Sequence, residues 1–469
     1  MEIVVEVGAL KRALEVVKDS ASKTRSYMSS LPVLQHAHIH AEGTTVRITT
    51  TDLGITTTYK LHGVDVVTEG VALFHCATLM AILKACDEPV VRLETGDAFN
   101  ALTTADGFYS FTYANPTEFP EVPRFIGENA KALGSGNLTS KMLVRAVNHV
   151  LYATAHDEMR EALNHVQLKT TGATLQLTGC DGNMMARSFT ILTGEQPDAM
   201  QALVHPDDLK RILRVAKKHE LTNIYVDVDS RVWFDFDSFR MIVRCSQSTY
   251  PDVDRVIPAT FSTVVEFDRL EMIAVLTRIA AAIPHKETSV KLHITEDRVL
   301  VMTAYTREDA IGCVEVTESI TVNTSGASLE WGARVAYLRN ALLHMDAERV
   351  ELHLNEKTTP GVLLPAGIPM AMTDQMVLVM PRLYREEPKD NSLSDGSKEP
   401  AVEDEDGETD EFAKNVQEDA PNESDNITSP DADNEPLEPN VPYEPDELDD
   451  PDYYDALDKA ERAGEAPCA

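Results

Sequence analysis

The sequence predicts an α+β protein made of three tandem copies of one domain, followed by a disordered acidic tail. The first observation is a pattern that occurs three times: a strand hydrophobe and then apolar residues at plus 5, 8, 9 and 12, which is typical of a strand running into an amphipathic helix. The three sets are Val5/Leu10/Ala13/Leu14/Val17, Leu138/Leu143/Ala146/Val147/Val150 and Phe267/Met272/Val275/Leu276/Ile279. Their offsets of 133 and 129 residues indicate a repeat of ~130 residues.

The second observation is that other marks recur with the same period. Thr51-Asp52 and Cys180-Asp181 lie 129 residues apart, and Phe119-Pro120-Glu121-Val122 and Tyr250-Pro251-Asp252-Val253 lie 131 apart. Each copy has a second helix candidate, at 76–87, 206–220 and 332–345, and alternating strands, for example at 45–50, 91–95, 224–228 and 349–354. Three unrelated α+β domains could share a strand-helix start, but a common period with matching motifs favours a repeat. We therefore expect domains at 1–128, 129–258 and 259–385.

The third observation is the composition of residues 386–469. This segment has 30 Asp/Glu against 5 Lys/Arg, ten of the 24 prolines and few Val, Ile, Leu or Phe residues. Such a chain buries too little apolar surface to offset the entropy of ordering, which predicts a disordered tail. Within it, 453–463 is a candidate for a short helix on a partner. Because the tail carries most of the net charge of −35, the first 385 residues have an ordinary globular composition.

Several classes of protein are excluded. No apolar run approaches the ~20 residues of a membrane span, and the acidic start is not a signal peptide, so we expect a cytoplasmic protein without a membrane partner. No phosphate-binding loop, dinucleotide fingerprint or nucleophile elbow occurs, so we expect neither an enzyme nor a cofactor. The six scattered cysteines form no CxxC pair and indicate reduced thiols rather than disulfides or a zinc site: Cys76, Cys86, Cys180, Cys245, Cys313 and Cys468.

Two groups of polar residues invite a chemical interpretation. His36, His38 and His40 would line one face of a strand and could bind zinc or copper, but no cysteine or carboxylate cluster adjoins them. An exposed sheet face is the preferred interpretation, and no metal site is predicted. Asp52 and Asp181 could act as paired acid-base groups, yet each occupies the same position of its own repeat, which favours turn-forming aspartates.

Basic residues concentrate on the predicted helices of this acidic chain. Helices that converge on a polyanion, with the sheets facing outward, would explain the distribution, and solvated amphipathic faces would explain it equally well. The residues concerned are Lys11, Arg12, Lys18, Lys84, Lys141, Arg145, Lys210, Arg211, Arg214, Lys217, Lys218, Arg269, Arg278, Arg334 and Arg339.

A series of short motifs resembles one known family. In order and spacing, the chain is similar to the bacterial DNA sliding clamp, the beta subunit of DNA polymerase III, over about residues 1–383. The motifs are Leu31-Pro32-Val33-Leu34, Thr51-Asp52-Leu53, Phe119-Pro120, Tyr250-Pro251-Asp252-Val253-Asp254-Arg255-Val256-Ile257-Pro258 and Val379-Met380-Pro381-Arg382-Leu383.

The resemblance implies a ring. Each chain would supply half of it as three clamp domains, with helices lining the hole and antiparallel sheets outside, and two chains would close it head to tail. Such a ring encircles double-stranded DNA without reading its sequence and needs only a loose attraction to phosphates. Its function is to tether a replicative polymerase after a clamp loader has placed it on DNA, so a non-catalytic processivity factor is implied.

The resemblance also implies a pocket between the second and third domains that binds short peptides of partner proteins. An apolar pocket with adaptable methionines suits such a ligand. Plain core at a domain boundary would explain Val256 and Val379 about as well, and the family's usual Asp-Gly-His-Arg-Leu is Asp181-Gly182-Asn183-Met184-Met185 here. The pocket would comprise Leu163, Cys180, Gly182, Asn183, Met184, Met185, Pro251, Arg255, Val256, Leu378, Val379, Met380 and Pro381.

Two further sets follow from the resemblance. The expected DNA-facing residues are Lys11, Arg12, Lys23, Arg25, Lys84, Lys141, Arg145, Lys210, Arg211, Arg214 and Arg278, although Asp157 and Asp207 stand where polar or basic residues are typical. The expected dimer interface joins Phe111 and Tyr113 of one subunit to Ala281, Ala282 and Ile283 of the other, a thin apolar contact.

One alternative stays open at this point. A scaffold that kept the clamp fold but lost DNA encirclement would account for the acidic substitutions and the thin interface. The tail leaves the body beside the expected peptide pocket, so it could screen that pocket or repel DNA, or serve only for solubility.

Overall fold

The computed structural model describes residues 1–21, 31–96, 98–123, 130–132, 138–156, 158–193, 199–227, 229–283, 288–295, 299–305 and 315–382. By contacts the chain divides into two units, Met1–Lys389 and Asp390–Ala469, and all described residues belong to the first. The predicted disordered tail therefore lies outside the described residues, as do Cys313 and Cys468.

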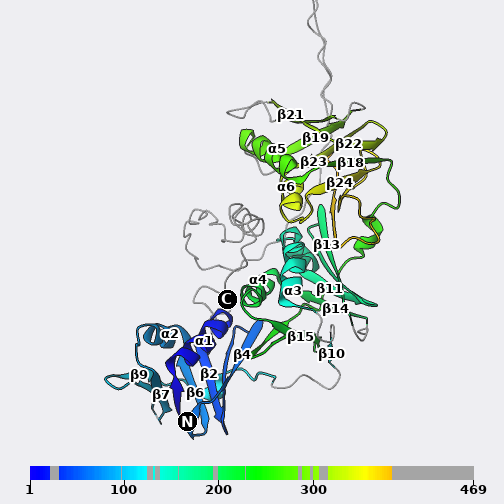
Figure 1. Ribbon diagram of the computed structural model, residues 1–469. Helices are drawn as coiled ribbons and strands as arrows, with labels where there is room; N and C mark the ends of the chain where they lie inside the picture. Colours follow the sequence, from blue (N-terminus) through cyan, green and yellow to red (C-terminus); the bar gives the residue numbers. More distant parts are fainter. Residues whose placement is uncertain are drawn as a thin grey trace, which may run out of the picture. The chain divides into compact units, whose positions relative to one another are not determined.

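The described residues of the first repeat form two α-helices and nine strands. Its helices are α1 (Val7–Val17) and α2 (Cys76–Lys84), which lie side by side (Figure 1). Its strands are β1 (Glu2–Glu6), β2 (His36–Glu42), β3 (Thr45–Thr51), β4 (Ile55–His62), β5 (Asp65–Thr68), β6 (Gly70–His75), β7 (Val90–Thr95), β8 (Phe99–Thr103) and β9 (Phe108–Thr112).

The second repeat has the same order of elements, except that its described residues contain no counterpart of β5. Its helices α3 (Ser140–Asn148) and α4 (Pro206–Ala216) also pack against each other. Thr139 accepts a hydrogen bond from Met142 N and so caps the start of α3. Its strands are β10 (Lys131–Ala132), β11 (Val166–Thr171), β12 (Thr174–Cys180), β13 (Met184–Ile191), β14 (Met200–Val204), β15 (Leu221–Val226), β16 (Arg231–Phe236) and β17 (Phe239–Arg244).

The third repeat again pairs two helices, α5 (Arg269–Ala282) and α6 (Val335–Leu343). Asp268 caps α5 by accepting a hydrogen bond from Glu271 N. Its strands are β18 (Thr263–Asp268), β19 (Ser289–Ile294), β20 (Val299–Tyr305), β21 (Glu315–Thr321), β22 (Asn323–Gly326), β23 (Leu329–Arg334), β24 (Arg349–Leu354), β25 (Gly361–Pro365) and β26 (Gln375–Val379).

Two sheets run across the boundaries between repeats. β4 of the first repeat pairs with β17, the last strand of the second, in a sheet ordered β10-β15-β16-β17-β4-β3-β2-β6. In the same way β13 of the second repeat pairs with β26, the last strand of the third, in a sheet ordered β14-β11-β12-β13-β26-β25-β24-β18-β22. The remaining sheets, β5-β1-β7-β8-β9 and β21-β20-β19-β23, belong to the first and third repeats alone. Every strand pair among the described residues is antiparallel, which confirms the predicted α+β class. The three successive sets of two helices and their strands confirm the threefold repeat.

The apolar residues that revealed the repeat form the cores. Leu10, Ala13, Leu14 and Val17 of α1 are all buried in the core of the first repeat, and their counterparts on α3 and α5 are buried in a core that the second and third repeats share. Ile55 of β4 belongs to this shared core, because β17 brings it alongside Val243. The strand junctions thus join the hydrophobic cores as well as the backbones.

One predicted helix boundary is wrong. The sequence pattern placed a helix over 332–345, but Gly332, Ala333 and Arg334 are the last residues of β23, and α6 begins at Val335. β23 pairs with β19 there, with Gly332 opposite Lys291. Trp331, Gly332 and Ala333 are all buried in this strand, so burial does not mark where the strand ends and the helix begins. The helices at 76–87 and 206–220 are present and end earlier, at Lys84 and Ala216.

Gly179 of β12 provides a test of close backbone packing beside the second junction. A methyl group on its Cα would lie 2.3 Å from the carbonyl oxygen of Val150. We expect Gly179→Ala to lower the free energy of unfolding by about 1–3 kcal/mol, because the backbone must move to relieve the overlap. Gly96→Ala is the matched control, since its methyl group would meet Phe99 at 3.7 Å. Denaturant unfolding of both variants measures the difference, and equal stabilities would contradict the packing.

Candidate functional site

An apolar cluster lies where the second and third repeats meet. Its buried members include Leu163, Cys180, Met185 and Tyr250 from the second repeat and Leu378 from the third. Burial raises the pKa of the Cys180 thiol and of the Tyr250 hydroxyl, so both stay protonated near neutral pH. We call this cluster, together with the exposed residues beside it, the junction pocket, after the peptide pocket that the resemblance implies. Four of the residues that the resemblance implied for a peptide pocket, namely Leu163, Cys180, Met185 and Leu378, are brought together in it.

Strand alternation divides the remaining expected pocket residues between two faces of the sheet. Met184 and Val379 are opposite each other across the β13–β26 pair, and both are buried in the shared core on the far face. They support the floor of the junction pocket from behind and do not line it. Val256 and Met380, in contrast, are 45% and 36% exposed at its rim, with Pro381 next to Met380.

One wall of the junction pocket is the segment that links the two repeats. Tyr250 and Pro251 lead into a single 3-10 turn at Val253–Val256. Asp252 caps this turn by accepting a hydrogen bond from Asp254 N, and its other oxygen receives a hydrogen bond from Arg255 Nε at 2.8 Å. Arg255 is largely exposed, so the wall offers an accessible cation beside the apolar cluster.

The tight turn between β12 and β13 forms another part of the rim. Asp181 Oδ1 accepts hydrogen bonds from Asn183 N at 2.8 Å and Met184 N at 2.7 Å, which confirms it as a turn-forming aspartate. Gly182 has φ +90, a conformation that favours glycine, and Arg160 donates to the Asp181 carbonyl above it. Asp52 makes the equivalent turn in the first repeat through Gly54 N and Ile55 N.

Basic residues of the helices form ion pairs at the first junction. Arg211 of α4 contacts Asp52 of the first repeat at 2.5 Å and Asp208 of its own helix at 3.6 Å. Arg214 lies 3.5 Å from Asp19, also across the junction. Burial raises the pKa of Asp208 to about 6, an effect that Arg211 opposes and Asp52 reinforces. Two of the cations expected to face DNA therefore already bind carboxylates of the neighbouring repeat.

A similar network crosses the second junction. Arg145 of α3 contacts Asp346 at 2.5 Å and Asp374 at 2.8 Å, both in the third repeat. The buried His149 lies 3.0 Å from the same Asp346 oxygen, to which Gln375 Nε2 donates at 3.0 Å. Burial alone would raise the pKa of Asp346, but the hydrogen bonds and charges of His149 and Arg145 hold it well below its usual range. Both junctions are thus crossed by arginine–aspartate pairs.

The other expected DNA-facing residues fall into three groups. Lys11 donates to the Cys86 carbonyl, Lys210 lies 3.6 Å from Asp207, and Arg278 makes a two-pronged pair with Glu318. Arg12, Lys84 and Lys141 are exposed and have no ion pair with the described residues. Lys23, Arg25 and Asp157 lie outside the described part of the chain.

The residues expected at a dimer interface lie at two sheet edges. β9 and β21 are the last strands of their sheets. Phe111 of β9 is buried against Phe74 with ring centroids 5.1 Å apart, and Ile283 is buried in the third repeat, so both side chains pack inward. Ala281 is exposed, Ala282 half-buried and Tyr113 40% exposed. Sequence reasoning missed Phe108 and Tyr109, which are 58% and 43% exposed on β9. Strand alternation places Phe108 on the face opposite Phe111 and was a signal for its exposure, but it places Tyr109 on the same face as Phe111 and gave no signal there.

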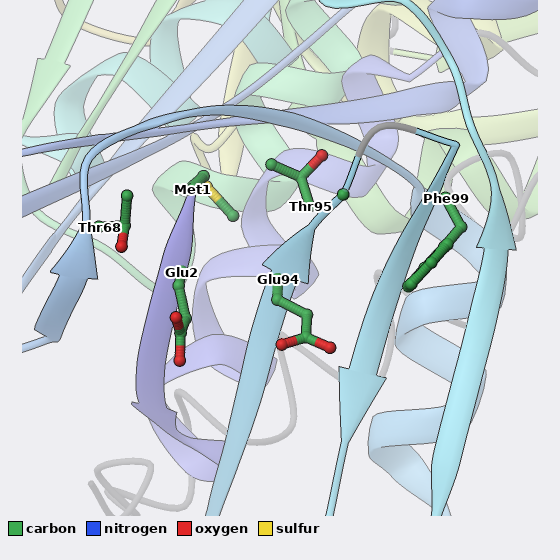
Figure 2. Close-up of a pocket in the computed structure, with 7 residues that line it drawn as sticks. Met1, Glu2, Thr68, Glu94, Thr95 and Phe99 are labelled. Carbon is green, nitrogen blue, oxygen red and sulfur yellow. The ribbon is translucent and has the colours of Figure 1, made fainter.

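Two cavities are lined by described residues, and the second of them adjoins the junction pocket. One, of about 250 Å³, is at the edge of the first sheet, where Figure 2 shows Glu2 and Glu94 on adjacent strands. Glu2 pairs with Arg92 at 2.8 Å, so this cavity has no free pair of carboxylates. The other, of about 420 Å³, shares Leu203 with the apolar cluster and is lined mostly by polar residues of the second repeat.

The three histidines on β2 have separate partners. His36 packs edge-on against His75, His38 lies 4.9 Å from Phe119, and His40 lies 3.4 Å from Arg47. Within the part of the chain that the structure describes, no group of histidine, cysteine and acidic side chains is arranged to hold a metal ion. The same part contains no helix long and apolar enough to cross a membrane.

Comparison with known proteins gives one consistent result. Residues 254–378 match the family model for the C-terminal domain of the DNA polymerase III beta subunit. The chain is 26% identical over 390 residues to the beta sliding clamp of Synechococcus elongatus, which covers 81% of this chain and 99% of that protein. It is 22% identical over 382 residues to the beta sliding clamp of Pseudomonas putida, with the same coverage.

Solved structures agree with these relatives. The DNA polymerase III beta subunit from Pseudomonas aeruginosa superposes with a TM-score of 0.72 at 21% identity, covering 82% of this chain and 100% of the other. The DNA polymerase sliding clamp from Bacillus subtilis also gives a TM-score of 0.72, at 17% identity and the same coverage. The threefold fold of the chain is therefore that of these structures.

The buried Asp208 predicts an unusual pH dependence. Its folded pKa of about 6 is above the ordinary value of 3.8, so the folded protein binds this proton more tightly than the unfolded chain does. The contribution of Asp208 to the free energy of unfolding should therefore rise by about 1 kcal/mol as the pH falls from 7 to 5. Asp208→Asn removes this pH-dependent contribution to the free energy of unfolding. Denaturant unfolding of both proteins at several pH values measures it, and parallel pH profiles would contradict the raised pKa.

Proposed function

This chain belongs to the family of bacterial-type DNA sliding clamps, the beta subunits of DNA polymerase III, and from that premise we propose that two copies close head to tail into a ring around double-stranded DNA. The ring holds a replicative polymerase at its template by raising its effective concentration there, without catalysing a reaction. A clamp loader places it on DNA, and it acts in the cytoplasm of a bacterial cell. The single observation that carries the proposal is how the repeats are joined.

Two junctions of one kind occur within the chain, and a third is left open. In each, the last strand of one repeat pairs with the same strand of the preceding repeat, β17 with β4 and β26 with β13. In the third repeat, the strand equivalent to β4 and β13 is β21. By the same rule, the last strand of the first repeat, β9, should therefore pair with a β21 strand. Both are sheet edges in this chain. A second copy supplies each missing partner, and unpaired edges favour such pairing.

Exposed side chains support the proposal that β9 and β21 of two subunits pair. Phe108 and Tyr109 of β9 would be covered by the second subunit, and Ala281 and Ala282 end the helix next to β21. Phe111 and Ile283, which we expected to meet across the interface, contribute from within by shaping the two edges.

The contact with DNA in this proposal is electrostatic. Of the cations expected to face DNA, Arg12, Lys84 and Lys141 are exposed and have no ion pair with the described residues, so they are available to phosphates. Arg145, Arg211 and Arg278 neutralise carboxylates of the protein first. This division suits a ring that must slide, because a few unspecific phosphate contacts attract DNA without fixing its position.

The junction pocket is the proposed site for partner proteins. Its buried floor of Leu163, Cys180, Met185 and Leu378 and its exposed rim of Val256 and Met380 suit a short peptide with apolar side chains. Both repeats contribute, so a bound peptide would contact the second junction directly.

The topological mechanism predicts how the protein leaves DNA. Loaded onto a nicked circular plasmid by a clamp loader, it should remain bound in high salt, because release would require the ring to open. Cutting the plasmid once should release it, because the ring can slide off an end. Gel filtration of the complexes before and after cutting measures retention. Equal retention on both forms would contradict encirclement.

The open junction predicts the effect of charges on β9. Phe108→Asp combined with Tyr109→Asp places two carboxylates at the edge that should pair with β21, so the dimer should dissociate at micromolar concentration, as sedimentation velocity would measure. Val90→Asp, at another exposed apolar position of the first repeat, is the control and should stay dimeric. A native protein that is already monomeric would favour a clamp-fold scaffold over a ring.

A further inference from the structure

A buried arginine lies beside the apolar cluster of the junction pocket. Arg187 is 5% exposed and sits on β13 opposite Met376. Because side chains alternate along a strand, Arg187 shares a face with Met185, which belongs to the cluster, and Phe189, which packs against it. Its charge also acts on Cys180 and Tyr250, both in the cluster. The peptide site proposed above therefore has a cation within its apolar floor.

This guanidinium has fewer partners than its donors require. An arginine carries five N–H donors, and buried charges are stable only when they are paired and hydrogen-bonded. The carboxylate near Arg187 is that of Asp254, 2.6 Å from its terminal nitrogen. Its Nε is buried and has no hydrogen-bond partner among the residues that the structure describes. A buried donor without an acceptor points to a ligand that supplies one.

Asp254 is placed where it can be exchanged. It lies in the 3-10 turn of the pocket wall, and its side chain is 61% exposed although Arg187 is buried. An exposed carboxylate loses little when it turns to solvent, whereas the buried Arg187 cannot lose the carboxylate of Asp254 without cost. A carboxylate of a bound peptide could take the place of Asp254 and leave the number of charges in the pocket unchanged.

We propose that Arg187 selects partner peptides that carry an acidic residue beside their apolar anchor, and that Asp254 holds this position in the empty pocket. The proposal rests on the peptide site of the proposed function and names the chemistry of its partner. Apolar residues of the peptide enter the cluster of Leu163, Met185 and Leu378. Its carboxylate pairs with Arg187, and Asp254 moves to water. An uncharged peptide cannot displace Asp254 and binds more weakly.

A purely structural pair would behave differently. If Asp254 only fixed the pocket wall to β13, its removal would weaken the binding of every peptide. If Asp254 competes with the carboxylate of the peptide, its removal should strengthen the binding of the acidic peptides. Asp254→Asn therefore separates the two roles, because they predict opposite changes.

The experiment uses the full chain and two matched sets of fluorescein-labelled octapeptides. Each peptide has two adjacent leucines, and the sets differ only in aspartate or asparagine at one flanking position. Fluorescence anisotropy gives the dissociation constants for the native protein, Arg187→Met and Asp254→Asn. Arg240→Met is the matched control, because Arg240 is a half-buried arginine that pairs with Asp235 at the first junction, away from the pocket.

We expect the native protein and Arg240→Met to bind the aspartate set about tenfold more tightly than the asparagine set, as a charge-assisted hydrogen bond provides. Arg187→Met should abolish this preference, and Asp254→Asn should tighten binding of the aspartate set. Equal binding of both sets by the native protein, or weaker binding of both sets by Asp254→Asn, would overturn the inference. If the native protein binds neither set, the peptide site of the proposed function fails, and this inference fails with it.

Discussion

The pairing of β17 with β4, and of β26 with β13, is the interaction on which the rest of the structure depends. The second and third repeats each end in a strand whose outer N–H and C=O groups need partners. A strand of the preceding repeat in the chain provides them. The same pairing joins the hydrophobic cores, since Ile55 of the first repeat is buried in the core of the next. It also leaves β9 and β21 as edges, and an edge of this kind is satisfied by another copy of the same chain.

Charges reinforce these backbone junctions. Arg211 with Asp52 ties the first and second repeats, and Arg145 with Asp346 and Asp374 ties the second and third. The Arg211–Asp52 pair is partly shielded from solvent, so it is screened less than a pair on the open surface, whereas Arg145 and Asp346 are about half exposed. A basic helix in this protein consequently has two kinds of cation. Some hold neighbouring repeats together, and others, such as Lys84 and Lys141, are exposed and have no ion pair with the described residues.

The junction pocket follows from the same pairing. β13 and β26 present Met185 and Leu378 on one face and Met184 and Val379 on the other, so the boundary between repeats has a core behind it and an apolar surface in front. The linking segment then covers one side of that surface through Asp254 and the buried Arg187. Residues of both repeats form this apolar surface, so a molecule bound there would contact both repeats.

The residues of the pocket floor were indicated by the resemblance to the clamp family. The sequence by itself determined the threefold repeat, the two helices of each copy and the turns at Asp52 and Asp181. These are local or periodic features, because hydrophobic spacing and turn chemistry act over a few residues. Only the tertiary structure decided that Arg145 and Arg211 bind carboxylates, that Phe111 faces inward while Phe108 is exposed, and that Arg187 lies beside the pocket. The partners of these side chains are distant in sequence, as Arg145 and Asp346 are, and a charge pattern does not reveal which carboxylate folding brings within reach of an arginine.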